Sequence, residues 1–249
     1  MRTIKITILT FTLVSLYVLA IGQVNSGKAE YVVELKLDRK SSLDPNVYSS
    51  ILYFSDLESV TEDDGISLTK ENNGGLNTFT DLSNNSNLPV YKNFKTNEMV
   101  SQGFVLDKLF RVCEPIPSIN WSLTSNKKEI AGITCLKALG HFRGREYVAW
   151  YAPNIPVNNG PWKFGGLPGL IFEITDTSNE VKFNLTKISL GLSKNELKRI
   201  REPQQGRKIT FDQYFDLWDK KAENLNDFLS AELNDLQINS QVFRIEKCK

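Results

Sequence analysis

Histidine and cysteine are scarce in this sequence: its 249 residues include one histidine, His141, and three cysteines. A single imidazole excludes a metal site built from several histidines. It also limits nucleophilic catalysis, because Cys135 lies six residues from His141, and on one extended strand that separation is about 20 Å. No serine stands in a G-x-S-x-G pattern, and the chain has no G-K-[ST] phosphate loop. We therefore assign no catalytic residue, no metal ligand and no cofactor.

An excess of charge of either sign is also absent, since 30 lysine and arginine residues face 29 aspartate and glutamate residues. Proteins that bind nucleic acids usually carry a basic excess, so nucleic acid is not an expected partner. The balance persists in residues 23–249, which hold 28 basic and 29 acidic residues. A region of this length suits a single large β-rich domain.

Long apolar runs are missing except at the N-terminus, where residues 6–21 form one behind two basic residues. The run ends with the small residues Ala20 and Gly22, at the −3 and −1 positions of a cut before Gln23. This pattern predicts a signal peptide over residues 1–22. An uncleaved membrane anchor is the alternative, although the run is shorter than the roughly 20 residues of a spanning helix. We expect an exported protein of the periplasm, cell surface or medium, with no transmembrane span in its mature chain.

The remaining chain consists mostly of short strand-like stretches separated by turn residues. These stretches are residues 30–37, 48–54, 90–94, 98–101, 104–112, 120–123, 130–139, 147–151, 170–175 and 181–190. Arg143-Gly144 and residues 176–179 are expected to be turns. The succession predicts a mainly β fold, a curved antiparallel sheet shaped like an open barrel or bowl. A closed lipocalin-like barrel and a two-sheet sandwich are the alternatives.

One long helix is expected over about residues 210–233. Thr210 can cap it, and Gln213 stands three residues later, at the spacing of a capping box. Large apolar side chains then recur at helical intervals: Phe211, Tyr214, Phe215, Trp218, Ala222, Leu225, Leu229 and Leu233. We expect this stripe to pack on the sheet. A connecting loop over 195–208 is expected before the helix, and a final strand over 237–245 after it.

The cysteines allow more than one disulfide. Exported proteins can form disulfides, and a bond between Cys113 and Cys135 would close a loop of about 20 residues, worth about 3 kcal/mol. Both residues lie in strand-like segments that could pair, so Cys113–Cys135 is the candidate disulfide. Cys248 could replace either partner.

The densest pattern is the segment from Gly160 to Ile171, which holds four glycines, two prolines and five large apolar residues. Proline fixes φ and glycine accepts unusual φ values, so the segment predicts a rigid loop that crosses between strands, with a type II turn at Pro168-Gly169. Its structural residues are Gly160, Pro161, Gly165, Gly166, Pro168 and Gly169. Its apolar residues Trp162, Phe164, Leu167 and Leu170 are the candidate ligand-binding residues.

Gly166-Leu167-Pro168-Gly169-Leu170-Ile171 is complete in this chain, and it resembles the hexapeptide that names the GLPGLI family of secreted Bacteroidota proteins. The resemblance extends from about Trp121 to Ile188. Further positions similar to the family are Lys127–Gly132, Cys135, Lys137-Ala138, Gly144-Arg145, Ala149–Tyr151, Ile155-Pro156, Gly160-Pro161 and Phe164. The resemblance implies secretion, but it implies no activity, since the family has no assigned role.

These observations favour a non-enzymatic envelope protein that binds an amphiphile, peptide or glycan in the concave face of its sheet. One alternative is an interaction or assembly protein for outer-membrane machinery, whose partner would be an outer-membrane protein. Another is a hydrolase that uses paired carboxylates, for which Glu173 and Asp176 are the nearest candidates. Whether the chain is an enzyme stays open.

Overall fold

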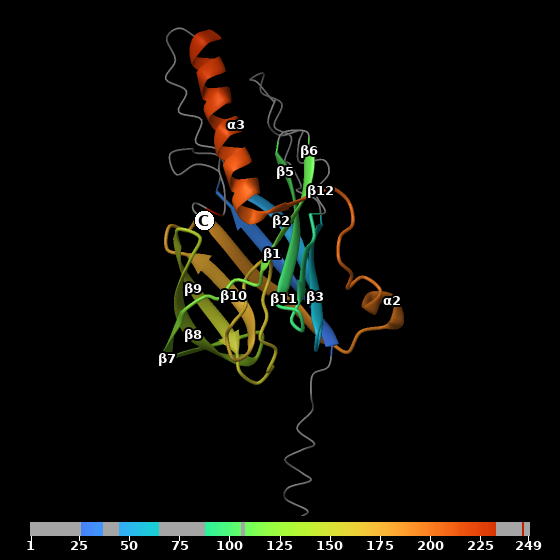
Figure 1. The fold of residues 1–249 in the computed structure, drawn as a ribbon. Coiled ribbons are helices and arrows are strands. Elements are labelled where there is room, and N and C mark those ends of the chain that lie inside the picture. The colour runs from blue at the N-terminus through green and yellow to red at the C-terminus, as the bar shows by residue number, and fades with distance from the viewer. Residues whose placement is uncertain (1–25, 37–44, 65–87, 106–107, 233–245, 247–249) are drawn as a thin grey trace, which may run out of the picture.

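The computed structural model describes residues 26–36, 45–64, 88–105, 108–232 and 246. Within these ranges the chain forms one sheet of twelve strands and two helices (Figure 1). The mainly β fold expected from the sequence is confirmed, and the sheet does not close into a barrel. The expected signal peptide, the final strand over 237–245 and Cys248 lie outside the described residues.

The strands alternate with short turns along most of the chain. Their bounds are β1 (Ser26–Leu35), β2 (Asn46–Ser55), β3 (Glu58–Asp64), β4 (Val90–Asn93), β5 (Glu98–Val105), β6 (Lys108–Pro115), β7 (Trp121–Ile130), β8 (Ile133–Phe142), β9 (Arg145–Ala152), β10 (Leu170–Asp176), β11 (Val181–Leu190) and β12 (Arg207–Thr210). The helices are α2 (Lys194–Leu197) and α3 (Phe211–Glu232). Residues 195–208, expected as a loop, therefore also supply most of α2 and the start of β12.

The sheet is made of two antiparallel meanders. Its strand order is β12-β6-β5-β4-β3-β2-β1-β11-β10-β9-β8-β7. One meander runs from β1 to β6, and the other runs from β7 to β11. The pairing of β1 with β11 joins them, and β12 then adds to the free edge of β6 in parallel.

The connection between the meanders requires the sheet to curve. β6 ends at Pro115 and β7 begins at Trp121, yet the two strands are ten positions apart in the sheet. In a flat sheet ten spacings would separate them by about 48 Å. A chain of six peptide units reaches at most about 21 Å. The sheet must therefore curl, and Figure 1 shows it strongly twisted.

Two turns predicted from the sequence are confirmed. Arg143 and Gly144 form the tip between β8 and β9, with φ values of 50° and 75°. Two successive positive φ values are typical of the type I′ turn, whose twist matches that of paired strands. Residues 176–179 turn the chain from β10 into β11.

The helix α3 begins and ends within one residue of the expected bounds. Its capping box forms as predicted: the Gln213 backbone N–H donates to the Thr210 hydroxyl at 3.3 Å, and the Thr210 N–H donates to the Gln213 side chain at 3.0 Å. Its first turns pack on β5, β6 and β12. The residues in this contact are Val105, Phe110, Val112, Ile209, Phe211, Tyr214, Phe215, Leu217 and Trp218. Figure 1 shows the helix running on beyond the sheet, so the expected packing is confirmed for the start of the helix alone.

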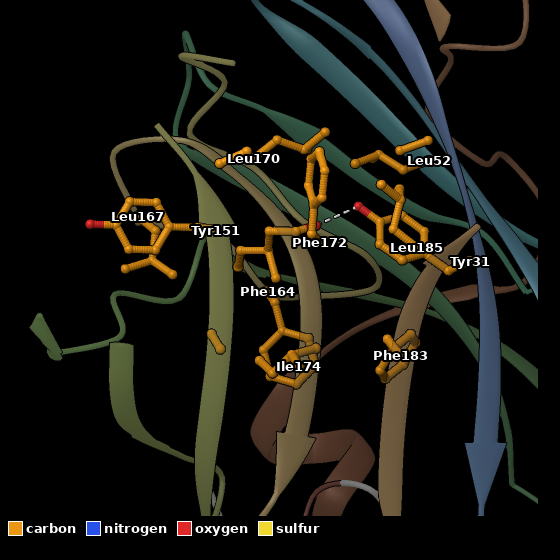
Figure 2. Packing of buried hydrophobic residues seen from close by; sticks show 14 of the residues in the cluster. Tyr31, Leu52, Tyr151, Phe164, Leu167, Leu170, Phe172, Ile174, Phe183 and Leu185 are labelled. Atoms are coloured by element: carbon orange, nitrogen blue, oxygen red, sulfur yellow. Dashed lines mark hydrogen bonds between the residues drawn. The ribbon is translucent and has the colours of Figure 1, made fainter. Parts of the chain in front are cut away.

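The main core lies on the β1, β2 and β8–β11 part of the sheet. Figure 2 shows Tyr31 reaching across it, where its hydroxyl donates to the backbone oxygen of Ile171 at 2.7 Å. Phe164 lies at the centre of an aromatic cluster. Its ring meets those of Phe142, Tyr147, Trp162 and Phe183 edge to face, with centroids 4.8–5.9 Å apart. Such contacts add to the stabilisation from burial alone.

The turn at Pro168 differs from the predicted type II turn. A type II turn needs a φ near +80° at Gly169, whereas its φ is 155°. The Gly169 N–H donates to the Leu167 oxygen at 2.8 Å, which closes a tighter three-residue turn. Glycine is still required, because a Cβ at Gly169 would lie 2.3 Å from the backbone oxygen of Ala152.

We predict that Gly169→Ala lowers the free energy of unfolding by well over 1 kcal/mol, because it adds a backbone clash to an unfavourable φ. Chemical denaturation measures the loss. Gly191→Ala is the matched control, since Gly191 also has a positive φ, +81°, but has open space around its Cβ position. Equal losses in the two variants would contradict the packing argument.

Candidate functional site

The segment from Pro153 to Gly169 links β9 to β10 and folds onto the core; we call it the Gly/Pro loop. The side chains of Phe164, Leu167 and Leu170 are at most 1% exposed, and Figure 2 shows all three within the buried cluster. Trp162 is partly buried against the same cluster. These four candidate ligand-binding residues therefore pack the interior, and a ligand role for them stays a prediction.

Backbone bonds hold the Gly/Pro loop in place. Asn159 and Gly165 form an isolated antiparallel bridge across it. The Asn159 oxygen accepts from the Ile171 N–H at 3.0 Å, which ties the loop to β10. The Trp121 indole N–H donates to the Gly165 oxygen at 2.8 Å, which ties it to β7. The loop thus crosses from β9 to β10 and is held by these bonds, and the rigidity expected from its proline and glycine content stays a prediction.

A cleft of about 690 Å³ lies beside this loop; we call it the loop cleft. Four parts of the chain meet there: the β2–β3 turn, the β4–β5 hairpin, the β6–β7 connection and the Gly/Pro loop. Its lining residues are Ser55, Asp56, Lys92, Phe94, Asn97, Ile116, Pro117, Ser118, Pro156, Val157, Asn158, Asn159, Lys163, Phe164, Gly165 and Gly166. The volume is within the range of small-ligand sites in proteins.

Lys92 of β4 lies at the base of the loop cleft with only 2% of the residue exposed. Its Nζ donates to the Phe164 oxygen at 2.6 Å, to the Asn159 Oδ1 at 3.0 Å and to the Gly160 oxygen at 3.5 Å. All these acceptors are neutral, and no carboxylate pairs with Lys92 among the described residues. Burial lowers the pKa of this amine to about 7, because the interior disfavours its charged form.

Asn159 is the main side-chain partner of Lys92 and is 1% exposed. Its Oδ1 also accepts from the Gly160 N–H at 2.9 Å. Two donors converging on Oδ1 fix the orientation of the amide, because the amide nitrogen cannot accept a hydrogen bond. The Nδ2 group is buried and has no hydrogen-bond partner within the described part of the chain.

A second buried lysine, Lys163, has a different environment. Its Nζ pairs with Glu114 at 2.9 Å and with Glu246 at 2.8 Å. Arg143 at the β8–β9 tip pairs with the same two carboxylates and stacks over the Phe211 ring, its guanidinium carbon 3.6 Å from the centroid. This network fastens the Gly/Pro loop to β6 and to the start of α3.

The two candidate hydrolytic carboxylates are not brought together. Glu173 pairs with Lys128, whereas Asp176 is buried and pairs with Arg145 at 2.6 Å. The Asp176 Oδ1 also accepts from the backbone N–H groups of residues 180 and 181, at 2.7 and 3.0 Å. Three residues apart on β10, the two side chains point to opposite faces of the sheet. Asp176 is thus a turn-stabilising residue.

His141 and Cys135 both lie on β8, as the sequence argument assumed. His141 is exposed, and its Nδ1 lies 2.7 Å from a Glu146 oxygen. Among the described residues, no three histidine, cysteine or acidic side chains gather in a way that could hold a metal ion. Nor does a helix in the described part of the chain have the length and apolar character needed to cross a membrane.

The candidate disulfide Cys113–Cys135 is wrong for this structure, in which both residues are free cysteines. Cys113 on β6 and Cys135 on β8 are nine positions apart in the sheet. Cys113 lies opposite Val100 and Thr210, and Cys135 lies opposite Lys128. A disulfide needs Cα atoms within about 7 Å, and the cross-strand neighbours of both cysteines are other residues.

Lys92 and Asn159 were not predicted as site residues from the sequence. A faint signal existed for Lys92, since it is two residues from Val90 in a short strand and so shares that residue's inward face. Asn159 gave no signal of its own, because its role depends on a strand more than sixty residues earlier.

Comparisons with known proteins support the resemblance over part of the chain. A family model described as "Protein of unknown function (Porph_ging)" matches residues 143–173, which span the β8–β9 tip, β9 and the Gly/Pro loop. The matched stretch lies within the region that resembles the GLPGLI family. A comparison with curated proteins finds no match.

The solved structures of PNGF-II show similarity of fold. The chain matches PNGF-II in its P21 crystal form with a TM-score of 0.52, 14% identity, and coverage of 79% of this chain and 34% of that one. The C2 crystal form of the same protein matches with a TM-score of 0.51, 14% identity, and coverage of 79% of this chain and 33% of that one. A putative outer membrane lipoprotein-sorting protein domain from Vibrio parahaemolyticus matches with a TM-score of 0.33, 8% identity, and coverage of 71% and 91%. The chain spans about a third of the length of PNGF-II, and the likeness concerns the fold alone.

We predict that unfolding stability rises with pH above 7 because of Lys92. Its folded pKa of about 7 lies below the value of about 10.4 for an unfolded lysine. At pH values between these two pKa values, the unfolded chain binds more protons than the folded protein. The free energy of unfolding therefore rises with pH, with a slope approaching about 1.4 kcal/mol per pH unit. Urea denaturation from pH 7.5 to 9 should show this slope in the wild type and its loss in Lys92→Met. Lys95→Met, which changes an exposed lysine of the same hairpin, should keep the slope.

We predict that Cys113 and Cys135 carry free thiols in the purified protein. Alkylation in denaturant without reductant, followed by mass spectrometry of a Cys248→Ser variant, should label both residues. Without denaturant Cys135 should resist labelling, since it is fully buried and burial raises its pKa to about 11. If the denatured variant took up no label at either cysteine, the result would contradict this prediction and indicate a Cys113–Cys135 disulfide.

Proposed function

We propose that this protein is a non-enzymatic binding module that holds an extended peptide segment in the loop cleft. The observation that carries the proposal is the cleft itself, which is about 690 Å³ in volume and is bordered by a loop that hydrogen bonds tie to β10 and β7. Its walls carry the apolar side chains of Phe94, Ile116, Pro117 and Val157, and its base carries a lysine and an amide. Apolar walls with a few fixed polar groups are typical of binding sites in proteins.

The packing of loop side chains against the sheet favours a peptide ligand over an amphiphile. Side chains of the Gly/Pro loop occupy the core, where Phe164 and Leu170 are 0% exposed. An acyl chain needs a continuous apolar cavity to remove it from water. The loop cleft is open and mixed in polarity, so it suits a chain with alternating apolar and polar groups.

The composition of the cleft also favours a peptide over a glycan. Among the described residues that line it, none is a tryptophan or a tyrosine. These are the flat side chains with a polar edge that best cover a sugar ring. The loop cleft instead offers proline, aliphatic and amide groups, which suit the backbone and small side chains of a peptide.

Binding without turnover agrees with the positions of the charged groups. Asp56 is the one acidic residue among those that line the loop cleft in the described part of the chain. Paired carboxylates for general acid–base catalysis need two such groups facing one substrate. The location in the cell envelope stays a prediction from the N-terminal leader.

We predict that Ser118→Trp reduces peptide binding at least tenfold, because Ser118 is an exposed residue of the cleft wall and an indole there would fill the cleft. Random dodecapeptides, displayed on phage through their N-termini so that their C-termini are free, would be selected against purified residues 23–249. The enriched peptides would be measured by calorimetry. Ser122→Trp places the same side chain at an exposed site on β7 outside the cleft, and should bind normally.

Two results would overturn the proposed function. One is the absence of any peptide enriched over a blank surface. The other is an equal effect of Ser118→Trp and Ser122→Trp on the peptides that are enriched.

A further inference from the structure

Two buried lysines border the loop cleft, and only one of them has a counter-ion. Lys163 pairs with two carboxylates at 2.9 and 2.8 Å. Lys92 has only neutral oxygen partners within the described residues. A buried charge is costly unless it is paired, so the surroundings of Lys92 lack the negative group that those of Lys163 contain.

An unused hydrogen-bond donor lies beside the same lysine. Asn159 Nδ2 is buried without a partner, on an amide whose orientation is fixed by the two donors at its Oδ1. Native proteins leave few buried polar groups unsatisfied, so each one needs an explanation.

The Lys92 ammonium also has one donor that is poorly used. Its bond to the Phe164 oxygen is 2.6 Å and that to Asn159 Oδ1 is 3.0 Å, but the Gly160 oxygen lies 3.5 Å away. A separation of 3.5 Å is at the outer limit of a hydrogen bond. A closer acceptor that enters along the loop cleft can therefore take this donor without breaking the other two bonds.

We propose that Lys92 and Asn159, which both line the loop cleft, form a subsite for a carboxylate. Lys92 supplies the charge, and Asn159 Nδ2 supplies a fixed N–H donor. Charge-assisted hydrogen bonds of this kind are roughly twice as strong as neutral ones. The bound carboxylate would give Lys92 the counter-ion that it lacks.

This inference rests on the proposed function and adds to it the chemistry of the ligand. In a peptide the carboxylate is either the C-terminus or the side chain of an acidic residue. The protein groups involved are the same in both cases, so the peptide must distinguish them. We therefore expect the binding of the enriched peptides to depend on one of two groups. It is either the free C-terminal carboxylate or one glutamate or aspartate position that the peptides share.

The sharpest test is Asn159→Asp. This change keeps an oxygen at the Oδ1 position for Lys92 and Gly160, so it preserves the contacts that hold the loop. It replaces the Nδ2 donor by a negative oxygen and supplies Lys92 with an internal counter-ion. We expect it to weaken the binding of carboxylate peptides at least tenfold while the melting temperature stays equal or rises.

Asn158→Asp is the matched control for charge. Asn158 also lines the loop cleft, is exposed, and uses its Oδ1 to accept from the Gly166 N–H at 2.6 Å. The variant adds the same negative charge at the rim and leaves the proposed subsite intact. We expect at most a threefold loss of binding, which should vanish at high salt because exposed charges are screened.

A second measurement needs no peptide. At pH 6, where Lys92 is protonated because its pKa is about 7, sodium acetate titrated into the isotope-labelled protein should shift the side-chain amide signal of Asn159 in a saturable way. Sodium chloride at equal ionic strength should not. Asn159→Asp cannot give this signal, so the Lys92 ammonium is followed in that variant and should not respond to acetate. Amidated C-termini and Glu→Gln changes in the selected peptides then identify the source of the carboxylate.

The outcomes separate the two proposals. If peptides bind but tolerate amidation, Glu→Gln changes and Asn159→Asp, the carboxylate subsite is wrong and the peptide cleft stands. If acetate shifts the Asn159 amide but no peptide is enriched, the subsite stands and the proposed function is wrong. An acetate response that sodium chloride reproduces would contradict the subsite.

Discussion

The short connection between β6 and β7 is the constraint on which the structure depends. Five residues join strands that are ten positions apart in the sheet. The sheet can meet this demand only by curling, because strand spacing is fixed by backbone hydrogen bonds. The same connection passes beside the Gly/Pro loop and supplies Ile116, Pro117 and Ser118 to the cleft. The curvature of the sheet and the position of the cleft therefore have one cause.

The inner face of a curled sheet must be covered by packed side chains. In this protein the Gly/Pro loop provides part of that cover. The Gly/Pro loop inserts Phe164 and Leu167 into the core, where water is excluded. Its backbone oxygens must then find donors, since unpaired polar groups are costly in the interior. Lys92 reaches from β4 to provide them. Its strongest bond, to the Phe164 oxygen, satisfies a buried part of the loop, and this places a lysine side chain among the residues that line the cleft.

Local patterns in the sequence predicted the features that local interactions decide. The capping box placed the start of α3, and the alternation of apolar residues with turn residues predicted a mainly β fold. The tip at Arg143-Gly144 followed from the φ freedom of glycine. The sequence also identified the segment 160–171 as a crossing loop, because proline and glycine restrict or permit backbone angles independently of the rest of the chain.

The features that the sequence did not predict depend on contacts between distant segments. Cys113 and Cys135 both lie on strands, but strand order sets their separation, and no local pattern encodes that order. A lysine within a strand is usually directed to solvent, and Lys92 is buried because a loop 72 residues later covers it. The apolar stripe of α3 predicted packing along the helix, whereas the sheet ends after the first turns.

The pairing of β1 with β11 has a consequence for how the polypeptide is made. β1 ends at Leu35, and β11 begins only at Val181. A ribosome releases the chain from its N-terminus, so the first meander can assemble while one side of its first strand has no neighbour. Unpaired strand edges invite association with other chains. A newly made molecule would thus need shielding by a chaperone or a translocation channel until its second half has emerged.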